Sequence, residues 1–359
     1  MPVRIRAAVA TLPVYRAGRR ATVGGSAHTP HKLSSNENPF PPLPEVLEAV
    51  ATACAEMNRY PDLASADLTD AVAARLSVPA ERLAFATGSV GLLYHLLQAV
   101  CEPGDEVVFA WRSFEAYPIA TQLTGAAQVR VQLGPGAVHD LAALQAAISP
   151  ATRVVLLCTP NNPTGPVLRH ADVVTLLDAV PDDIAVVIDE AYVEFVRDPQ
   201  AVRSLELLDR PNVVVLRTFS KAYGLAGFRV GYAVAAPEVA TAIRAVALPF
   251  GVSVPAQAAA VAALGVEAKL LAQVEHLVRA RDELADGLRR LGYAVPETHA
   301  NFVWLPAGPL TEEYAAAFGR ASLSVRPYMA GDEHDGIRIT VGVPEANARV
   351  LEVADTLDR

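Results

Sequence analysis

Short apolar runs alternate with longer stretches of helical spacing through the first two thirds of the chain. Seven runs rich in Val, Ile, Leu and Phe predict strands at 82–88, 105–110, 126–133, 153–159, 184–191, 212–218 and 228–235. Apolar residues recur with helical period between them and predict helices at 90–100, 114–123, 139–148 and 168–179. Because these strands are apolar on both faces, the alternation predicts an α/β fold with a mostly parallel central sheet.

The rhythm changes after "ALPFGVSVP". A long helical stretch is predicted at 255–291, followed by strands at 301–306, 324–328 and 336–342 and a closing helix at 344–358. The opening residues are rich in Pro, Gly and small side chains, which is typical of an extended arm. We therefore expect an N-terminal arm over 1–30, a large domain over 31–248 and a smaller α+β domain over 249–359.

Composition argues against several classes of protein. Hydrophobic residues make up 52% of the 359 residues and charged residues 19%, which is enough for a sizeable core. Thirty basic and thirty-nine acidic residues leave a net charge of −9, and no basic run is long enough to bind nucleic acid. No apolar run approaches the roughly 20 residues that span a bilayer. Pro13 interrupts the N-terminal stretch, which argues against a signal peptide.

The cysteines and histidines suggest neither a disulfide framework nor a metal site. Cys54, Cys101 and Cys158 are far apart and odd in number. The eight histidines show no metal-ligand spacing, so we expect no metal. These features favour a reducing compartment, the cytoplasm.

Polar residues gather where four of the predicted strands end. The strand at 82–88 ends in "TGS" at the start of a helix. The strands at 153–159, 184–191 and 212–218 are followed by "TPNNPTG", "DEAY" and "TFSKAYG". Ligands of open α/β sheets bind beyond the carboxyl ends of the strands. The four segments are therefore expected to line one site.

Each of these signals has an ordinary structural reading when taken alone. Asp189 follows five apolar residues and suits a buried ion pair or a helix cap, and Lys221 suits a solvated loop. "TGS" is a common helix cap and "NNPTG" a common turn. Together they meet the needs of pyridoxal phosphate. A desolvated lysine suits its aldehyde, a buried carboxylate its ring nitrogen, and backbone donors, hydroxyls and an arginine its phosphate.

At these residues the chain resembles the fold-type I pyridoxal-phosphate aminotransferases. Within them it resembles the branch of histidinol-phosphate aminotransferases and actinobacterial aromatic amino acid aminotransferases. The resemblance runs through more than 300 residues, in the segments "LPVYRAG", "SSNENPF", "NRYPD", "NNPTG", "DEAYVEF", "RTFSKAYGLAGFRVGY", "ANFVW" and "GIRITVG". It implies a fold-type I transferase, a transamination, and a homodimer whose two active sites share residues.

The resemblance also implies roles for individual residues. The implied catalytic residues are Lys221, which binds the cofactor's aldehyde, Asp189, which pairs with its ring nitrogen, and Tyr192, which donates to its phenolic oxygen. The other implied cofactor ligands are Asn162 at the phenolic oxygen, Ser89, Val90, Thr218, Ser220 and Arg229 at the phosphate, Phe114 on the ring, and Tyr60 from the neighbouring subunit. The implied substrate residues are Arg338, which receives the carboxylate, with Arg326, Asn36 and Tyr15 nearby.

Two amino donors remain open. The segment "AWRSFEAYPI" at 110–119 resembles the aromatic branch, so we favour an aromatic amino acid as donor and 2-oxoglutarate as acceptor. A histidinol-phosphate enzyme is the alternative, because "SSNENPF" fits both branches and Arg326 suits a phosphate. Arg326 could equally serve a carboxylate or pair with Glu37.

Three other classes are weaker rivals. A threonine-phosphate decarboxylase uses the same cofactor residues and differs in its product. A regulator with an aminotransferase-like domain needs a basic helix-turn-helix segment, which the first 30 residues do not supply. A nicotinamide-dependent dehydrogenase needs G-x-G-x-x-G after a strand, and the sequence has none.

Overall fold

A seven-stranded sheet forms the centre of the larger part of the molecule. The computed structural model describes residues 3–13, 18, 29–330 and 334–358. Across the sheet the strands lie in the order β2 (Leu83–Ala86), β8 (Gly231–Val234), β7 (Val213–Thr218), β6 (Ala185–Asp189), β5 (Thr152–Cys158), β3 (Glu106–Trp111) and β4 (Ala127–Gln132). Within this sheet β8 alone runs against its neighbours. All seven predicted strands are present, and the mostly parallel sheet is confirmed.

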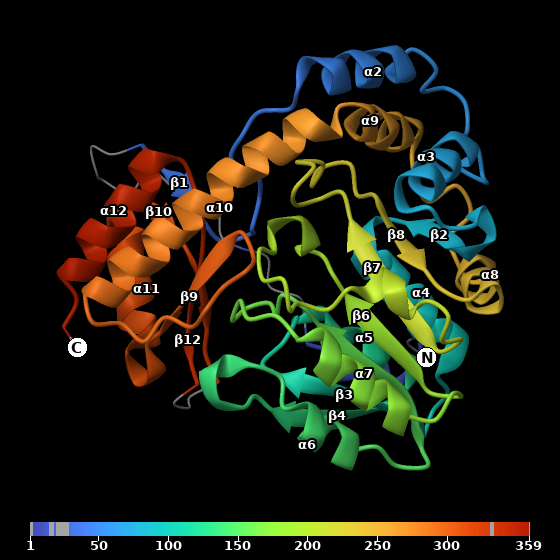
Figure 1. Ribbon diagram of the computed structural model, residues 1–359, viewed down its shortest axis with the longest axis horizontal. Coiled ribbons are helices and arrows are strands. Elements are labelled where there is room, and N and C mark those ends of the chain that lie inside the picture. The colour runs from blue at the N-terminus through green and yellow to red at the C-terminus, as the bar shows by residue number, and fades with distance from the viewer. Residues whose placement is uncertain (1–2, 14–17, 19–28, 331–333, 359) are drawn as a thin grey trace.

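Helices pack on this sheet through apolar faces (Figure 1). Helix α4 buries four leucines at helical spacing against the strands: Leu92, Leu93, Leu96 and Leu97. The helices of this part are α2 (Pro44–Cys54), α3 (Ala66–Leu76), α4 (Gly88–Val100), α5 (Ala116–Thr124), α6 (Leu141–Ala146), α7 (His170–Ala179) and α8 (Pro237–Ala245). Short 3-10 turns lie at η1 (Ala80–Arg82), η2 (Pro135–Ala137), η3 (Val193–Phe195) and η4 (Ser204–Leu207). This packing leaves the strand ends as the place where polar side chains gather.

A second, smaller sheet forms the C-terminal part. It is antiparallel, in the order β11 (Arg326–Tyr328), β12 (Gly336–Thr340) and β9 (Phe302–Pro306). Its helices are η5 (Gly308–Leu310), α11 (Thr311–Arg320) and α12 (Pro344–Asp355). Figure 1 shows this part at one end of the molecule, connected to the rest by the long helix α10.

The strand predicted at 324–328 is wrong, because two strands replace it. Strand β10 (Leu323–Ser324) pairs in parallel with β1 (His31–Lys32), whereas β11 pairs with β12. The chain changes partner at Val325, and a change of partner leaves no mark in a short apolar run. The N-terminal segment thereby runs along the C-terminal part.

The single helix predicted at 255–291 is also wrong. It is two helices, α9 (Val254–Gly265) and α10 (Glu267–Arg290), bent by 81° at their junction. Gly265 ends the first helix and Val266 leaves helical geometry, with φ −117° and ψ 21°. The bend lets α9 pack on α2 while α10 packs on α12. No single helix of the described ranges is long and apolar enough to cross a membrane, and only the bent pair passes by combined length and composition.

The described part of the N-terminal arm is not wholly extended as predicted. It contains one turn of helix, α1 (Ala7–Ala10), which packs on α5. Gln122 Nε2 donates to the carbonyl of Ala8 at 2.9 Å, and Arg6 Nη2 donates to the carbonyl of Leu123 at 3.1 Å. These bonds anchor the arm beside the helix that follows Phe114.

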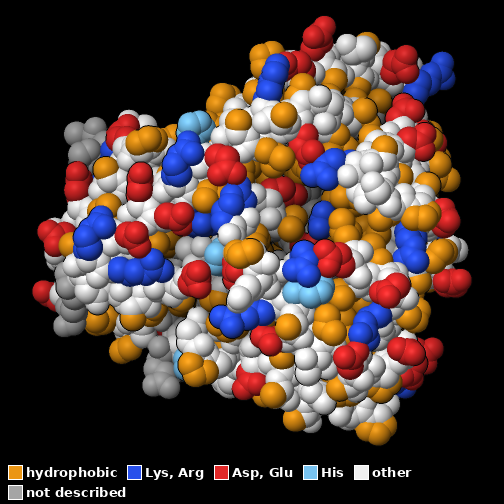
Figure 2. Space-filling view, viewed as in Figure 1, with side chains coloured by type: hydrophobic (Ala, Val, Ile, Leu, Met, Phe, Trp, Pro, Cys, Tyr) orange, Lys and Arg blue, Asp and Glu red, His pale blue; other side chains and the backbone are white. Residues whose placement is uncertain are grey.

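Charges of both signs are interspersed over the surface of the molecule in the view of Figure 2. Lysine and arginine side chains lie between aspartates and glutamates on this face, with apolar side chains among them. Neither positive nor negative side chains therefore dominate this face.

Candidate active site

The carboxyl ends of β3, β5, β6 and β7 meet the first turn of α4 at a cavity of about 260 Å³. Its walls include most of the site residues predicted from the sequence: Ser89, Val90, Phe114, Asn162, Asp189, Tyr192, Thr218, Ser220, Lys221, Arg229, Arg326, Arg338 and Asn36. Segments that are far apart in the sequence therefore meet at one cavity, because the carboxyl ends of the parallel strands lie at the same edge of the sheet. Tyr60 does not line the cavity, and Tyr15 lies outside the described residues.

Lys221 follows β7 and reaches the cavity half-buried. Its Nζ donates a hydrogen bond to the carbonyl of Ser35 at 3.1 Å and lies 5.7 Å from the ring centre of Tyr192. Burial, and after it the nearby Arg338 guanidinium, lowers the pKa of Lys221 to about 7. The lowered pKa favours the neutral amine, which is the form that attacks a carbonyl.

Asp189, the last residue of β6, presents a buried carboxylate to the cavity. Its Oδ2 accepts a hydrogen bond from the hydroxyl of Tyr117 at 2.9 Å, while its buried Oδ1 has no hydrogen-bond partner among the described residues. Burial raises the pKa of Asp189 to about 6, and the Tyr117 hydroxyl opposes that rise. A buried acceptor without a donor is costly, so this oxygen is suited to a ligand that brings one.

Tyr117 was missed by the sequence analysis. It lies in α5, three residues after Phe114, and the two rings meet edge to face at 5.7 Å. The segment "FEAY" carries this i, i+3 spacing, which was the available signal. Its hydroxyl is the donor that keeps Asp189 acidic.

Another end of the cavity is rich in hydrogen-bond donors. Backbone N–H groups at the start of α4, beside Ser89 and Val90, have no acceptor within the helix and carry its positive dipole end. The Thr218 hydroxyl donates to Ser220 Oγ at 3.0 Å, and Arg229 Nη1 donates to the same oxygen at 3.2 Å. A phosphate fits such a set of donors.

Glycine keeps this donor-rich end open. A Cβ on Gly231 would lie 2.7 Å from the backbone nitrogen of Ser89 and 2.7 Å from the carbonyl oxygen of Arg217. Backbone atoms cannot move aside as a flexible side chain can. The close approach of β8 to the start of α4 therefore requires glycine at this position.

A buried network fixes Tyr192. Asn36 donates from Nδ2 to the Tyr192 hydroxyl at 2.8 Å and from its backbone N–H to Thr340 Oγ1 at 2.9 Å. Asn301 Nδ2 donates to the carbonyl of Asn36 at 3.1 Å. The N-terminal segment is thus connected to the ring that Lys221 faces.

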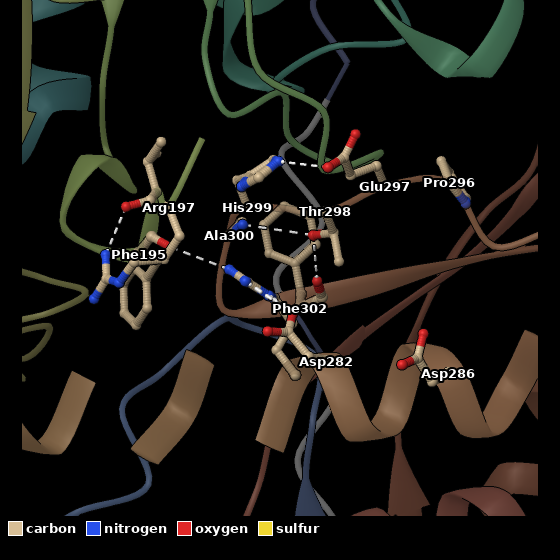
Figure 3. A network of polar contacts seen from close by, with 12 residues as sticks. Phe195, Arg197, Asp282, Asp286, Pro296, Glu297, Thr298, His299, Ala300 and Phe302 are labelled. Carbon is tan, nitrogen blue, oxygen red and sulfur yellow. Dashed lines mark hydrogen bonds and ion pairs between the residues drawn. The ribbon is translucent and has the colours of Figure 1, made fainter. Parts of the chain in front are cut away.

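The loop between α10 and β9 sets the position of Asn301. Thr298 Oγ1 donates to the carbonyl of Phe302 at 2.8 Å, and Figure 3 shows Thr298, Ala300 and Phe302 turned toward one another. The N–H of His299 donates to the carbonyl of Gly165 at 2.9 Å. A Cβ on Gly165, whose φ is +103°, would lie 2.5 Å from Thr298 Oγ1, so the loop packs directly on the "NNPTG" turn.

Two arginines face each other at the remaining end of the cavity. Arg326 of β11 and Arg338 of β12 are direct partners in the small sheet. Arg338 is only 7% exposed and donates to three neutral oxygens, Asn162 Oδ1, the Tyr328 hydroxyl and the carbonyl of Ser34. Its buried Nε has no hydrogen-bond partner among the described residues. Arg338 is thus the cation to which a substrate carboxylate can bind.

Arg326, by contrast, has a carboxylate of its own. Its Nη2 donates to Glu115 Oε2 at 2.6 Å. Glu37, the partner considered from the sequence, pairs instead with Lys32 at 2.7 Å. Glu115 was not predicted as a site residue, because it lies 211 positions from Arg326.

The donor set fits pyridoxal phosphate. A protonated pyridine nitrogen supplies the hydrogen that Asp189 Oδ1 lacks, and Lys221 supplies an amine for the aldehyde. The hydroxyls and N–H groups around Ser220 and the start of α4 match the phosphate. The ring nitrogen, the aldehyde and the phosphate of pyridoxal phosphate would thus each find a matching group in the cavity.

Comparison with known proteins agrees with this chemistry. The family model for aminotransferase class I and II matches residues 29–353, and the chain belongs to that family. Class I and II aminotransferases depend on pyridoxal phosphate, which confirms the cofactor predicted from the strand ends.

The relatives place the chain more narrowly within the family. It is 52% identical to an aromatic amino acid aminotransferase of Streptomyces avermitilis, over 98% of this chain and 97% of that protein. It is 50% identical to one of Thermobifida fusca, over 99% of this chain and 97% of that protein. The crystal structure of histidinol-phosphate aminotransferase from Sinorhizobium meliloti in complex with pyridoxal-5'-phosphate is 28% identical, with TM-score 0.87 over 100% of this chain and 99% of that one. The predicted fold-type I architecture and the predicted branch are both confirmed.

Proposed function

We propose that the protein transfers the amino group of an aromatic L-amino acid to 2-oxoglutarate, giving the aromatic 2-oxo acid and L-glutamate. Relatives named aromatic amino acid aminotransferase, 46–52% identical over nearly the whole chain, support this donor. The observation that carries the proposal is the cavity itself. It joins an amine of lowered pKa, a buried carboxylate and one arginine whose described partners are neutral oxygens.

Bound pyridoxal phosphate withdraws electrons from the bonds at the Cα of an amino acid joined to it. Asp189 would keep the ring nitrogen protonated, since its Oδ1 has no partner among the described residues, and the hydrogen bond from the Tyr117 hydroxyl favours the ionised carboxylate. Lys221 Nζ would hold the cofactor at its aldehyde, and once the substrate amine displaces it, the freed amine would move the proton from the substrate Cα. The Ser35 carbonyl, 3.1 Å from Nζ, orients the amine for both steps.

The remaining residues bind and orient. Arg338 binds the substrate carboxylate as a two-pronged donor. Asn162 and Tyr192, which line the cavity, would hold the phenolic oxygen of the cofactor, and Phe114 would cover its ring. The phosphate would be held by Ser89, Val90, Thr218, Ser220 and Arg229, which line the donor-rich end of the cavity. Asn36 fixes the Tyr192 hydroxyl, and Arg326 lies at the side-chain end of the substrate.

An assay of donors tests the substrate class. Phenylalanine, tyrosine and histidinol phosphate are offered separately with 2-oxoglutarate, and glutamate formation is measured. We expect the aromatic amino acids to have the higher kcat/KM, and a preference for histidinol phosphate would reverse the assignment. Carbon dioxide released from threonine phosphate would instead identify a decarboxylase.

Lys221→Ala tests the catalytic assignment. The variant keeps the cavity but lacks the amine that binds the aldehyde and moves the proton. We expect loss of turnover together with loss of the absorbance of lysine-bound cofactor. Turnover retained at the level of the unaltered protein would contradict the role of Lys221.

We also propose a homodimer with shared active sites. Tyr60 is 81% exposed and stacks on Phe250 at 4.6 Å, with Met57, Leu63 and Leu248 exposed as well. Exposed apolar side chains of this number mark an interface. If Tyr60 serves the neighbouring subunit's phosphate, mixed dimers of Tyr60→Ala and Lys221→Ala chains contain one intact site. Mixing the two variants then restores more activity than both show alone, whereas a site made by one chain gains nothing.

The cytoplasm is the compartment that we propose. Cys54, Cys101 and Cys158 are all free thiols in the structure. Free thiols are typical of a reducing compartment. Fractionation of cells that express the tagged protein tests this placement.

A further inference from the structure

The buried amide of Asn161 is a group that the proposed chemistry does not use. It precedes Asn162, which lines the cavity, in the turn after β5, and it is only 1% exposed. Its Nδ2 donates to the carbonyl of Arg112 at 3.0 Å and to Thr164 Oγ1 at 2.8 Å, and its Oδ1 accepts from Ser113 Oγ at 2.8 Å. The side chain therefore connects this turn to the segment that follows β3.

A fourth hydrogen bond shows which way the amide faces. His139, between η2 and α6, has its Nε2 3.1 Å from Asn161 Oδ1. The hydroxyl of Thr164 donates its proton to the carbonyl of Ala137 at 2.9 Å, so its oxygen accepts from Asn161 Nδ2. Oδ1 is then the acceptor on the other side, and His139 Nε2 carries the proton that it receives. Burial lowers the pKa of His139 to about 4, which keeps the ring neutral.

Every hydrogen-bonding position of this amide is used. An amide has two donor hydrogens and one oxygen that accepts two bonds. A flipped amide would place its oxygen against the carbonyl of Arg112 and its nitrogen against the N–H of His139, and buried groups left unpaired in this way are costly. The four contacts therefore hold the Asn161 side chain in one orientation.

The backbone of the same turn is closed around this side chain. The N–H of Asn161 donates to the carbonyl of Pro166 at 2.8 Å, and the N–H of Gly165 donates to the carbonyl of Asn161 at 2.7 Å. Asn162 lies inside this closed turn, and its Oδ1 accepts a hydrogen bond from Arg338 Nη1. Its Nδ2 is therefore the group left to donate to the phenolic oxygen of the cofactor. Hydrogen bonds weaken steeply when their geometry departs from the best distance and angle, so this donor depends on where the turn is held.

We propose that Asn161 is a positioning residue, whose amide holds the turn against the end of β3 so that Asn162 meets the phenolic oxygen of the cofactor. Ser113 and His139 fix that amide from two further segments of the chain. The role rests on the proposed contact between Asn162 and the phenolic oxygen. A residue outside the cavity wall thereby influences the charge on the cofactor.

The protonation of lysine-bound cofactor reports this contact. A donor at the phenolic oxygen stabilises its negative charge and so lowers the pKa at which lysine-bound cofactor loses its proton. The absorbance of the cofactor-loaded protein is followed against pH without substrate. Asn161→Asp keeps the shape of the side chain but has no donor for the carbonyl of Arg112. We expect the pH midpoint to rise by about one unit in this variant.

Three further variants test whether the effect passes through Asn162. Asn162→Ala removes the donor itself and should raise the midpoint at least as far, and adding Asn161→Asp to it should cause no further rise. Ser113→Ala removes one partner of the amide and should give a smaller rise, so it tests the same contact even where Asn161→Asp fails to fold. Asn212→Asp is the matched control. It alters a buried amide that donates to the carbonyl of Ile184 at 3.1 Å, before the start of β7 and away from the cavity, and should leave the midpoint unchanged.

The possible outcomes separate this role from a structural one. A lowered melting temperature with an unmoved midpoint in Asn161→Asp and Ser113→Ala overturns the proposal, and so does a rise that adds in full to that of Asn162→Ala. An unmoved midpoint in Asn162→Ala removes the proposed contact with the phenolic oxygen and the inference with it. The amino donor does not enter, because no substrate is present. If phenylalanine fails as a donor and the midpoints shift as expected, the donor assignment fails and the role of Asn161 stands.

Discussion

The hydroxyl of Tyr117 sets the acidity of Asp189, and Tyr117→Phe removes it while leaving the ring. The hydroxyl donates to Asp189 Oδ2 at 2.9 Å in a buried position, and Asp189 Oδ1 has no hydrogen-bond partner among the described residues. A hydrogen bond to a charged group contributes about 1.5–3 kcal/mol. One pKa unit corresponds to about 1.4 kcal/mol, so the pKa of Asp189 should rise by about 1–2 units. From about 6 it would move to about 7–8.

Cofactor affinity reports this shift because the ring nitrogen is held by the ionised carboxylate. The affinity of the cofactor-free protein for pyridoxal phosphate is measured by titration between about pH 5 and about pH 9. This range contains both expected midpoints. The unaltered protein should lose affinity as the pH falls below about 6. Tyr117→Phe should lose it below about pH 7–8.

Two controls make the result decisive. Asp189→Asn cannot ionise, so its profile gives the titration of the cofactor itself, which is subtracted. Tyr293→Phe removes a buried hydroxyl that donates to the carbonyl of Ala354 at 2.7 Å, far from Asp189 in the sequence, and should leave the pH midpoint unchanged. Equal midpoints in Tyr117→Phe and the unaltered protein would refute the link between the two groups.

Three further perturbations follow from the same structure. Burial raises the pKa of Glu194 from 4.5 to about 7, so the free energy of unfolding falls as the pH rises through this range. Glu194→Gln should raise the free energy of unfolding at pH 8 by about 3 kcal/mol in urea denaturation and leave it unchanged at pH 4. Gly231→Ala forces a Cβ against the N–H of Ser89 and should weaken cofactor binding at least about tenfold in a titration, whereas Gly227→Ala, with nothing within 4 Å, should not. Because only a neutral amine attacks an aldehyde, the rate at which Lys221 of the cofactor-free protein reacts with pyridoxal phosphate should rise with pH through a midpoint near 7, and a midpoint near 10 would contradict its burial.

The sheet and the polar strand ends could be predicted because their signals are local. Strand β6 is a continuous apolar run that ends in Asp189, and both facts can be read from neighbouring letters. Lys221 after β7 and Asn162 after β5 follow the same rule, and the parallel sheet then brings the three to one edge. Local sequence pattern and known sheet geometry were therefore sufficient to predict the position of these three residues.

The rest depends on contacts that leave no local trace. Glu115 is one acidic residue at the start of a helix until Arg326 comes within 2.6 Å of it. The carbonyls of Ser34 and Ser35, which accept hydrogen bonds from Arg338 and Lys221, are backbone groups that every residue carries. The bend at Gly265 lies inside an alanine-rich run whose helical signal continues on both sides. In each case tertiary packing decides what the local sequence leaves open.

The pairing of β1 with β10 has a consequence for the time at which activity arises during synthesis. Asn36 and its partner Thr340 are 304 residues apart, and a ribosome adding about 5–20 residues per second needs roughly 15–60 s to make the stretch between them. The seven strands of the large sheet, with Lys221 and Asp189, are translated within that interval. A nascent chain can therefore carry the reactive amine on a folded sheet while the segment that orients it still lacks its strand partner.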